Sequence, residues 1–179
     1  MYYYILDRDN TITNSIVLED GADLSAFGAI ADERVFNIGD TWTPVPPTPE
    51  ELEAALTEAK AARIQQSKAD LEAYLEAHPL TWTDGNQYSI TREKQQQLTS
   101  KILSATLAHQ TATPYELTWN ATGAECTPWT LEELAALAFA IDARVTALVS
   151  YQQAKEVAMQ AAATLEELEG VKVDYDEVS

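Results

Sequence analysis

The side chains that could carry out chemistry are few in this sequence, and they are not grouped. His78 and His109 stand alone and far apart, and six glycines form no phosphate-binding loop. The single cysteine, Cys126, leaves no intrachain disulfide and no cysteine cluster for zinc. Cys126 with a histidine could form a thiol nucleophile, but its surroundings favour a small residue in a hairpin. We therefore expect no catalytic residue, no metal site and no cofactor.

Two pairs of adjacent glutamates could be read as acid–base pairs. They are Glu132-Glu133 and Glu166-Glu167, and each follows a threonine, Thr130 or Thr164. A threonine with a glutamate three positions later forms a capping box, in which both side chains satisfy free amide groups at a helix start. The pairs therefore predict two helix starts and no catalytic dyad.

The four tryptophans lie in or beside predicted strands and turns. Stacking on a ligand is one possible role, and anchoring hairpins against helices is the favoured one. The four are Trp42, Trp82, Trp119 and Trp129.

Three long segments have the apolar spacing of amphipathic helices. They cover residues 49–77, 92–109 and 130–163, and the last has the clearest stripe. Between them, alternating segments at about 80–90 and 115–127 predict two β-hairpins, the first around the turn dipeptide Asp84-Gly85. The stripe of the last helix comprises Leu134, Leu137, Ala138, Ile141, Val145, Leu148 and Val149.

The remaining segments complete an α+β chain. Residues 1–42 predict a small β-rich unit, with a hairpin of strands 2–6 and 11–18 and further short strands at 29–31 and 34–36. Residues 43–49 are rich in proline, which favours a semi-rigid interdomain linker over a proline-rich docking ligand. A mainly α domain of long helices with the two inserted hairpins follows over residues 50–163. Residues 164–179 form an acidic tail, in which a very short helix starts at Thr164 and ends at Gly170. Residues 171–179 are expected to be extended and solvated, or else a strand that pairs with a partner.

The composition excludes several classes of partner. The 179 residues carry 11 Lys plus Arg against 29 Asp plus Glu, a net charge of −18, which repels nucleic acids and anionic membranes. We find no apolar run that resembles a membrane span of roughly 20 residues. The acidic excess either keeps the protein soluble, the favoured explanation, or complements a basic partner.

The second hairpin and the start of the last helix carry a family resemblance. Residues 117–129, LTWNATGAECTPW, contain a Trp-x-x-x-Gly-x-x-Cys hairpin, and residues 130–138, TLEELAALA, form an acidic helix start. This stretch resembles a domain of unknown function that is widespread in tail-module proteins of tailed bacteriophages and prophages. The preceding order matches too, including the glutamine-rich start EKQQQL at residues 93–98. Asn120 and Thr122 replace the histidine and aspartate common in that hairpin, which argues against a ligand or metal there.

The N-terminal unit has a resemblance of its own. A tyrosine-rich strand, a strand at residues 12–17 and the turn Ile38-Gly39-Asp40 are similar to the small β unit that often begins phage tail and tail-fibre-associated proteins. The resemblance implies docking on a partner through this unit. The residues expected to dock are Tyr2, Tyr3, Tyr4, Ile12, Ile16 and Trp42.

Together the resemblances imply a non-enzymatic structural protein of the baseplate or tail-fibre region. It would dock on other tail proteins, such as the tail fibre or receptor-binding protein, and form a homo-oligomer. It would lie in the virion tail after assembly in the host cytoplasm. The alternative is a tail-fibre assembly chaperone that holds the receptor-binding protein, and a third hypothesis is an envelope glycan-binding or hydrolase module that uses Trp82 or Trp119.

Overall fold

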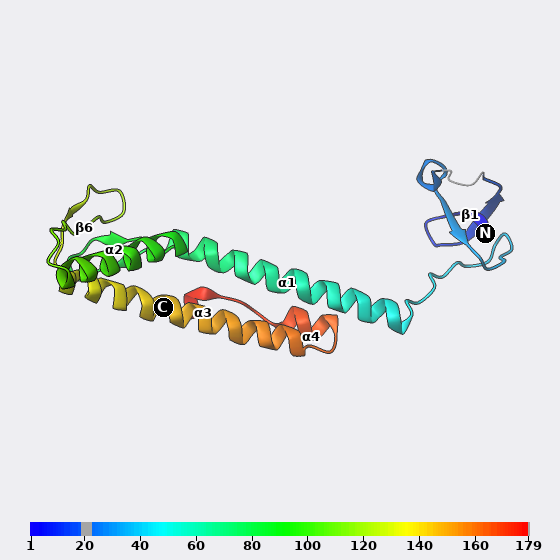
Figure 1. Ribbon diagram of the computed structural model, residues 1–179. Helices are drawn as coiled ribbons and strands as arrows, with labels where there is room; N and C mark the ends of the chain where they lie inside the picture. Colours follow the sequence, from blue (N-terminus) through cyan, green and yellow to red (C-terminus); the bar gives the residue numbers. More distant parts are fainter. Residues whose placement is uncertain (19–22, 179) are drawn as a thin grey trace. The chain divides into compact units, whose positions relative to one another are not determined.

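The chain has an α+β fold made of two compact units, Met1–Pro49 and Glu50–Ser179 (Figure 1). The computed structural model describes residues 1–18 and 23–178. The first unit contains a three-stranded sheet, and the second contains long helices with two small hairpins, as the sequence predicts.

The sheet unit is antiparallel, with the strand order β2-β1-β3. Its strands are β1 (Tyr2–Leu6), β2 (Ile12–Ile16) and β3 (Ala29–Asp32). The turn between β1 and β2 closes because the Asp7 carboxylate accepts hydrogen bonds from the amides of Asp9 and Thr11, each at 2.9 Å. A 3-10 turn, Leu24–Phe27, precedes β3 and ends at Gly28, whose φ of 59° favours glycine.

The predicted strand at residues 34–36 is wrong. This segment is an irregular loop that packs over Tyr4 instead. The Tyr4 hydroxyl donates to the Arg34 carbonyl and accepts from the Phe36 amide, both at 3.1 Å, and the Tyr4 and Phe36 rings meet edge to face. Because Tyr4 satisfies these two backbone groups, the segment needs no strand partner.

The helical unit alternates helices with hairpins in the predicted order. Its elements are α1 (Pro49–Ala77), β4 (Leu80–Thr81), β5 (Gln87–Tyr88), α2 (Arg92–Gln110), β6 (Thr118–Trp119), β7 (Thr127–Pro128), α3 (Leu131–Ala161) and α4 (Leu165–Gly170), followed by a 3-10 turn, Tyr175–Val178. The predicted capping box is present at the start of α3. The Thr130 hydroxyl accepts from the Glu133 amide at 3.2 Å, and the Glu133 carboxylate accepts from the Thr130 amide at 3.0 Å.

The inner face of α3 forms the centre of the core. Leu134, Leu137 and Leu148 are at most 2% exposed, and they join buried residues of α1, α2 and both hairpins in one cluster. Polar groups also link α1 to α3, because the buried Gln152 side chain donates to the Ser67 hydroxyl at 3.1 Å. A buried amide that lacked this partner would cost roughly 1–3 kcal/mol, so the pair fixes the register of the two helices.

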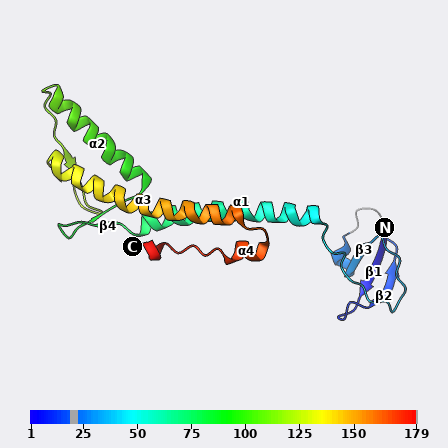
Figure 2. The same cartoon turned by 90° about the horizontal axis from the view of Figure 1, so that it is seen from below.

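The expectation of a solvated C-terminal tail is corrected by the structure. Residues 164–178 run back beside α3, orange to red in Figures 1 and 2, and the short helix predicted to start at Thr164 and end at Gly170 is present as α4. Leu168 is buried against Met159, and Tyr175 is buried with its hydroxyl 2.7 Å from the Ser67 carbonyl. The alternation of apolar residues in this segment reflects packing on the helices. Ser179 lies outside the described residues.

The expected absence of a membrane span stays a prediction. Within the described chain, α3 is long and apolar enough to cross a membrane by length and composition alone, and only 28% of its most apolar window is buried. No uninterrupted apolar run stands out in the sequence, because Asp142 and Arg144 lie in the middle of this stretch. A core helix of a soluble protein passes the same test, so length and composition alone do not identify a membrane span here.

Candidate functional site

The sheet of the N-terminal unit has one covered face and one open face. In a strand, successive side chains point to opposite faces, and directly paired residues share a face. Tyr3 pairs with Ile16 of β2 and with Ala31 of β3, and Ile5 pairs with Asn14 and Ala29. Tyr3, Ile5 and Ile16 are half-buried and lie on this face together. We call these three side chains the outer sheet face.

The opposite face of the sheet holds the core of the unit. Tyr4 and Ile12 are each 1% exposed, so the expectation that they dock on a partner is corrected to a core role. Tyr2 lies on the same face as Tyr4, where their rings stack with centroids 6.3 Å apart, and it keeps 45% of its surface exposed. Of the six residues expected to dock, Tyr3 and Ile16 share the open face, and Tyr2 is exposed at the edge of the covered one.

Trp42, the sixth expected docking residue, is held in place by a buried carboxylate. The indole Nε1 donates to Asp32 Oδ2 at 2.8 Å, and the Arg34 guanidinium donates to both Asp32 oxygens at 2.9 and 2.6 Å. The hydrogen bonds from Arg34 hold the pKa of Asp32 well below its usual range, and the Trp42 indole lowers it further. Trp42 therefore closes the unit beside the Thr11–Thr41 bridge, where its indole has a structural role.

A second candidate surface lies on α3, opposite its buried stripe. Phe139 is 75% exposed and Val157 is 65% exposed. They are about five full turns apart and therefore lie on one line along the helix. The residues between them on this line are exposed and uncharged. We call the line the outer α3 stripe; it comprises Ala136, Phe139, Ala143, Thr146, Ser150, Gln153 and Val157.

The spacing of the outer α3 stripe alternates between three and four residues. This is the heptad spacing of helices that pack against a partner helix, and small residues let the two backbones approach closely. The buried residues Leu137, Ile141 and Leu148 lie on the other side of the helix axis. α3 therefore has one buried apolar stripe and a second, exposed stripe of uncharged residues, in which Phe139 and Val157 are the large apolar side chains. Sequence reasoning missed the second, although the helical interval between Phe139 and Val157 could have revealed it.

The two hairpins of the helical unit contact each other, and their aromatic residues serve as anchors. The Thr122 amide donates to the Gln87 carbonyl at 2.8 Å, which joins the second hairpin to the first. Tyr88 meets Trp129 edge to face at 5.7 Å, and Trp119 is 5% exposed in the core. Trp82 packs against the same core and is half-buried. These contacts fit the anchoring role predicted for the tryptophans.

Asp84 shapes the first hairpin. Its carboxylate accepts from the Asn86 amide and side chain, each at 2.9 Å, and from the Tyr88 hydroxyl at 2.8 Å. The hydrogen bonds from Asn86 lower the pKa of Asp84, whereas burial, assisted by the Asp84 charge, raises the pKa of Tyr88 to about 12. All of these bonds lie within residues 84–88, so they stabilise the turn.

The isolated reactive side chains have ordinary surroundings. His78 stacks on Tyr74 with ring centroids 3.9 Å apart, and His109 is exposed in the last turn of α2. Cys126 is exposed, with its Sγ 3.8 Å from Asn120 Oδ1. Across residues 1–18 and 23–178, no three His, Cys, Asp or Glu side chains are grouped in a way that could hold a metal ion.

Comparison with known proteins gives one match. A family model described as Domain of unknown function (DUF4376) matches residues 58–176, which include α2, α3, both hairpins and most of α1. No curated protein and no solved structure matches the chain. The matched residues lie within the helical unit and exclude the sheet unit.

Proposed function

The chain belongs to the DUF4376 family, and we propose that it is a non-enzymatic structural protein of a bacteriophage tail. In this proposal it lies in the baseplate or tail-fibre region and works by docking on other tail proteins and by self-association. The observation that carries the proposal is the outer α3 stripe, an uncharged helix face with the exposed apolar side chains Phe139 and Val157, which the chain itself does not cover.

Self-association through this stripe follows from its geometry and charge. A second copy of α3 can pack on the three-and-four spacing, with Phe139 and Val157 as anchors at either end and small residues between them. Burying a Phe or Val side chain stabilises by about 1.5–3 kcal/mol before the entropy cost of association. Asp142 and Glu132 flank the stripe, so charge repulsion is confined to its start.

The outer sheet face supports docking on a different protein. Tyr3, Ile5 and Ile16 present an apolar surface, and Val17 next to them is 97% exposed. β2 is an edge strand, and beyond the Thr11–Thr41 bridge no described strand pairs with its outer edge. Such an edge can accept a strand from a partner. A unit this small is stabilised further when a partner covers it.

The tail assignment rests on the sequence resemblances of residues 93–138 and 2–42 to phage tail-module proteins. Mass spectrometry of purified particles, from a phage or induced prophage that encodes this chain, tests it. We expect the chain at a fixed ratio to the tail-fibre and baseplate proteins. If the chain binds the fibre protein in lysates but is missing from finished particles, it is the assembly chaperone instead. If it is found with neither, the tail assignment is wrong.

The docking surface can be tested separately. Replacing Tyr3 and Ile16 together with serine removes two apolar side chains from the outer sheet face without entering the core. We expect co-purification with the fibre or receptor-binding protein to fall at least about tenfold, because interface anchors typically contribute more than 1 kcal/mol each. Val35→Ser, at a residue that is 71% exposed elsewhere in the same unit, is the control. If both variants retain the same amount of the fibre or receptor-binding protein, the outer sheet face is not the docking surface.

A further inference from the structure

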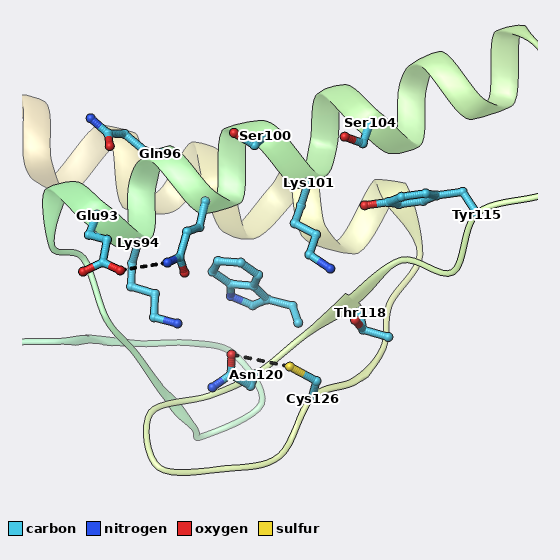
Figure 3. A pocket seen from close by; sticks show the side chains of 12 residues that line it. Glu93, Lys94, Gln96, Ser100, Lys101, Ser104, Tyr115, Thr118, Asn120 and Cys126 are labelled. Atoms are coloured by element: carbon cyan, nitrogen blue, oxygen red, sulfur yellow. Dashed lines mark hydrogen bonds between the residues drawn. The ribbon is translucent and has the colours of Figure 1, made fainter.

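A groove of about 590 Å³ lies between α2 and the hairpin of β6 and β7. Figure 3 shows Lys94 and Lys101 extending from α2 toward the hairpin, with Tyr115 near Lys101 and with Asn120 and Cys126 on the far side. Lys94 and Lys101 are seven residues apart, so they lie on one face of the helix, about 10 Å apart along its axis. The groove therefore carries two ammonium groups in a row.

These lysines are unusual in so acidic a chain. The sequence has 29 acidic and 11 basic residues, yet neither Lys94 nor Lys101 forms an ion pair with any residue that the structure describes. Among the described residues that line the groove, Glu93 in the first turn of α2 is the only carboxylate. Its Oε1 accepts a hydrogen bond from the Gln97 side chain at 2.9 Å. The two ammonium groups thus remain available to an anion.

Lys94 is positioned by the floor of the groove. Its Nζ lies 5.4 Å from the centroid of the Trp119 ring, and Trp119 is 5% exposed within the core. A cation above an indole face is attracted by the ring and keeps its other sides open to a ligand. The rigid hairpin therefore fixes one of the two charges before any ligand arrives.

Neutral polar groups and an exposed ring complete the lining. Gln96, Ser100 and Ser104 follow one another at intervals of four along α2 and line the groove together with Thr118 of the hairpin. Tyr115 is 42% exposed at one end. Hydroxyl and amide side chains exchange hydrogen bonds with hydroxyl-rich ligands, and an exposed aromatic ring packs on the apolar face of a ring ligand.

We propose that this groove binds an acidic saccharide, with Lys94 and Lys101 on its carboxylates and Tyr115 against a sugar ring. An acidic peptide would use the two ammonium groups, but the hydroxyl and amide ladder together with the exposed ring matches a carboxylated sugar better. At physiological ionic strength the Debye length is about 8 Å, so the negative charges of the chain that lie farther than this from the groove are largely screened from a ligand bound there. This inference is independent of the docking function.

Calorimetric titration of the full chain tests the proposal with three probes. The probes are a tetrasaccharide of alternating glucuronic acid and N-acetylglucosamine, a neutral tetrasaccharide of N-acetylglucosamine, and a polyglutamate peptide. We expect the acidic saccharide to bind and the other two to bind at least about tenfold more weakly. Added salt should weaken the binding of the acidic saccharide because charged contacts are screened.

Matched variants identify the groove as the site. Lys94→Gln with Lys101→Gln should weaken acidic-saccharide binding at least about tenfold, because two charge-assisted contacts are lost. Lys155→Gln with Lys172→Gln makes the same change in net charge outside the groove and should leave binding unchanged. Tyr115→Leu should weaken saccharide binding while circular dichroism stays that of the native fold.

Four results would overturn the proposal. The first is that the acidic saccharide does not bind, and the second is that the neutral saccharide binds with the same affinity. The third is that polyglutamate binds more tightly than the acidic saccharide, which would make the groove an acidic-peptide site. The fourth is that the two lysine double variants lose the same amount of affinity.

Discussion

Asp32 shows how a single side chain can organise the small sheet unit. Its carboxylate is 6% exposed and accepts hydrogen bonds from Arg34 and from the Trp42 indole. Arg34 also donates to the Thr43 carbonyl at 2.7 Å, which ties the start of the proline-rich segment to the sheet. A buried carboxylate is stable only with such partners. The cluster thus compensates for the small core of the unit.

Asp32→Asn should destabilise the sheet unit in a pH-dependent way. The folded-state pKa of Asp32 is lowered, so its stabilising contribution is complete above the unfolded pKa of about 3.9 and is lost as pH falls through the folded value. We expect the stability difference between wild type and variant to be largest near neutral pH and to shrink in acid. The NMR signal of the Trp42 indole N–H, followed during urea unfolding at several pH values, measures this difference in the free energy of unfolding. A difference that is the same at all pH values would contradict this account.

Two tyrosines should titrate late. Burial raises the pKa of both Tyr88 and Tyr175 to about 12, with smaller effects from nearby Asp84 and Asp70, respectively. Because these pKa values are raised in the folded state, the associated stability is present below about pH 10 and is lost as pH rises toward 12. The ultraviolet absorbance of tyrosinate should show a delayed fraction that Tyr88→Phe and Tyr175→Phe each reduce. If every tyrosine of the folded protein titrates near pH 10, the raised pKa values of Tyr88 and Tyr175 are refuted.

At the scale of elements, helix boundaries could be predicted because local chemistry determines them. Thr130 with Glu133 marks the start of α3, and Thr164 with Glu167 marks that of α4, where the Thr164 hydroxyl accepts from the Glu167 amide at 3.1 Å. The first hairpin followed from Asp84-Gly85, since Gly85 has a φ of 81° that other residues rarely adopt. These signals act between residues only a few positions apart.

Thr130→Ala should lower the free energy of unfolding by about 1 kcal/mol, because the variant loses the hydroxyl that accepts the Glu133 amide. Chemical denaturation followed by circular dichroism measures the loss. Thr57→Ala, at an exposed position within α1, is the control and should be neutral or slightly stabilising. Equal effects at the two positions would show that the capping box is not formed.

What the sequence could not reveal depends on contacts between distant segments. The C-terminal segment was expected to be solvated because of its acidic residues, yet its apolar residues pack on helices more than a hundred positions earlier, as with Tyr175 and the Ser67 carbonyl. Tyr4 and Ile12 were expected at the surface because strand alternation does not tell which face is covered. The irregular loop at residues 34–36 covers that face, and periodicity does not predict such a loop.

At the scale of the whole molecule, the candidate surfaces were partly predictable. The unit boundary near Pro49 follows from the proline-rich segment. Of the residues expected to dock, Tyr3 and Ile16 do lie on the open face of the sheet. The outer α3 stripe was not anticipated, because the buried stripe alone explains why a helix forms. Only the exposure of Phe139 and Val157 shows that α3 has more apolar surface than one chain covers.

The account therefore depends on whether α3 has a partner helix in solution. Phe139→Glu with Val157→Glu places two charges on the outer α3 stripe, and Ala69→Glu with Ala73→Glu places the same charges on exposed positions of α1. Neither pair enters the core.

Sedimentation equilibrium across a range of protein concentrations is the most direct measurement. We predict a mass above the 19.7 kDa of one chain for the wild type and for the α1 control, and a mass of one chain for the α3 variant. A wild-type protein that stays at 19.7 kDa at every concentration, or an α3 variant that associates as the wild type does, would contradict the account.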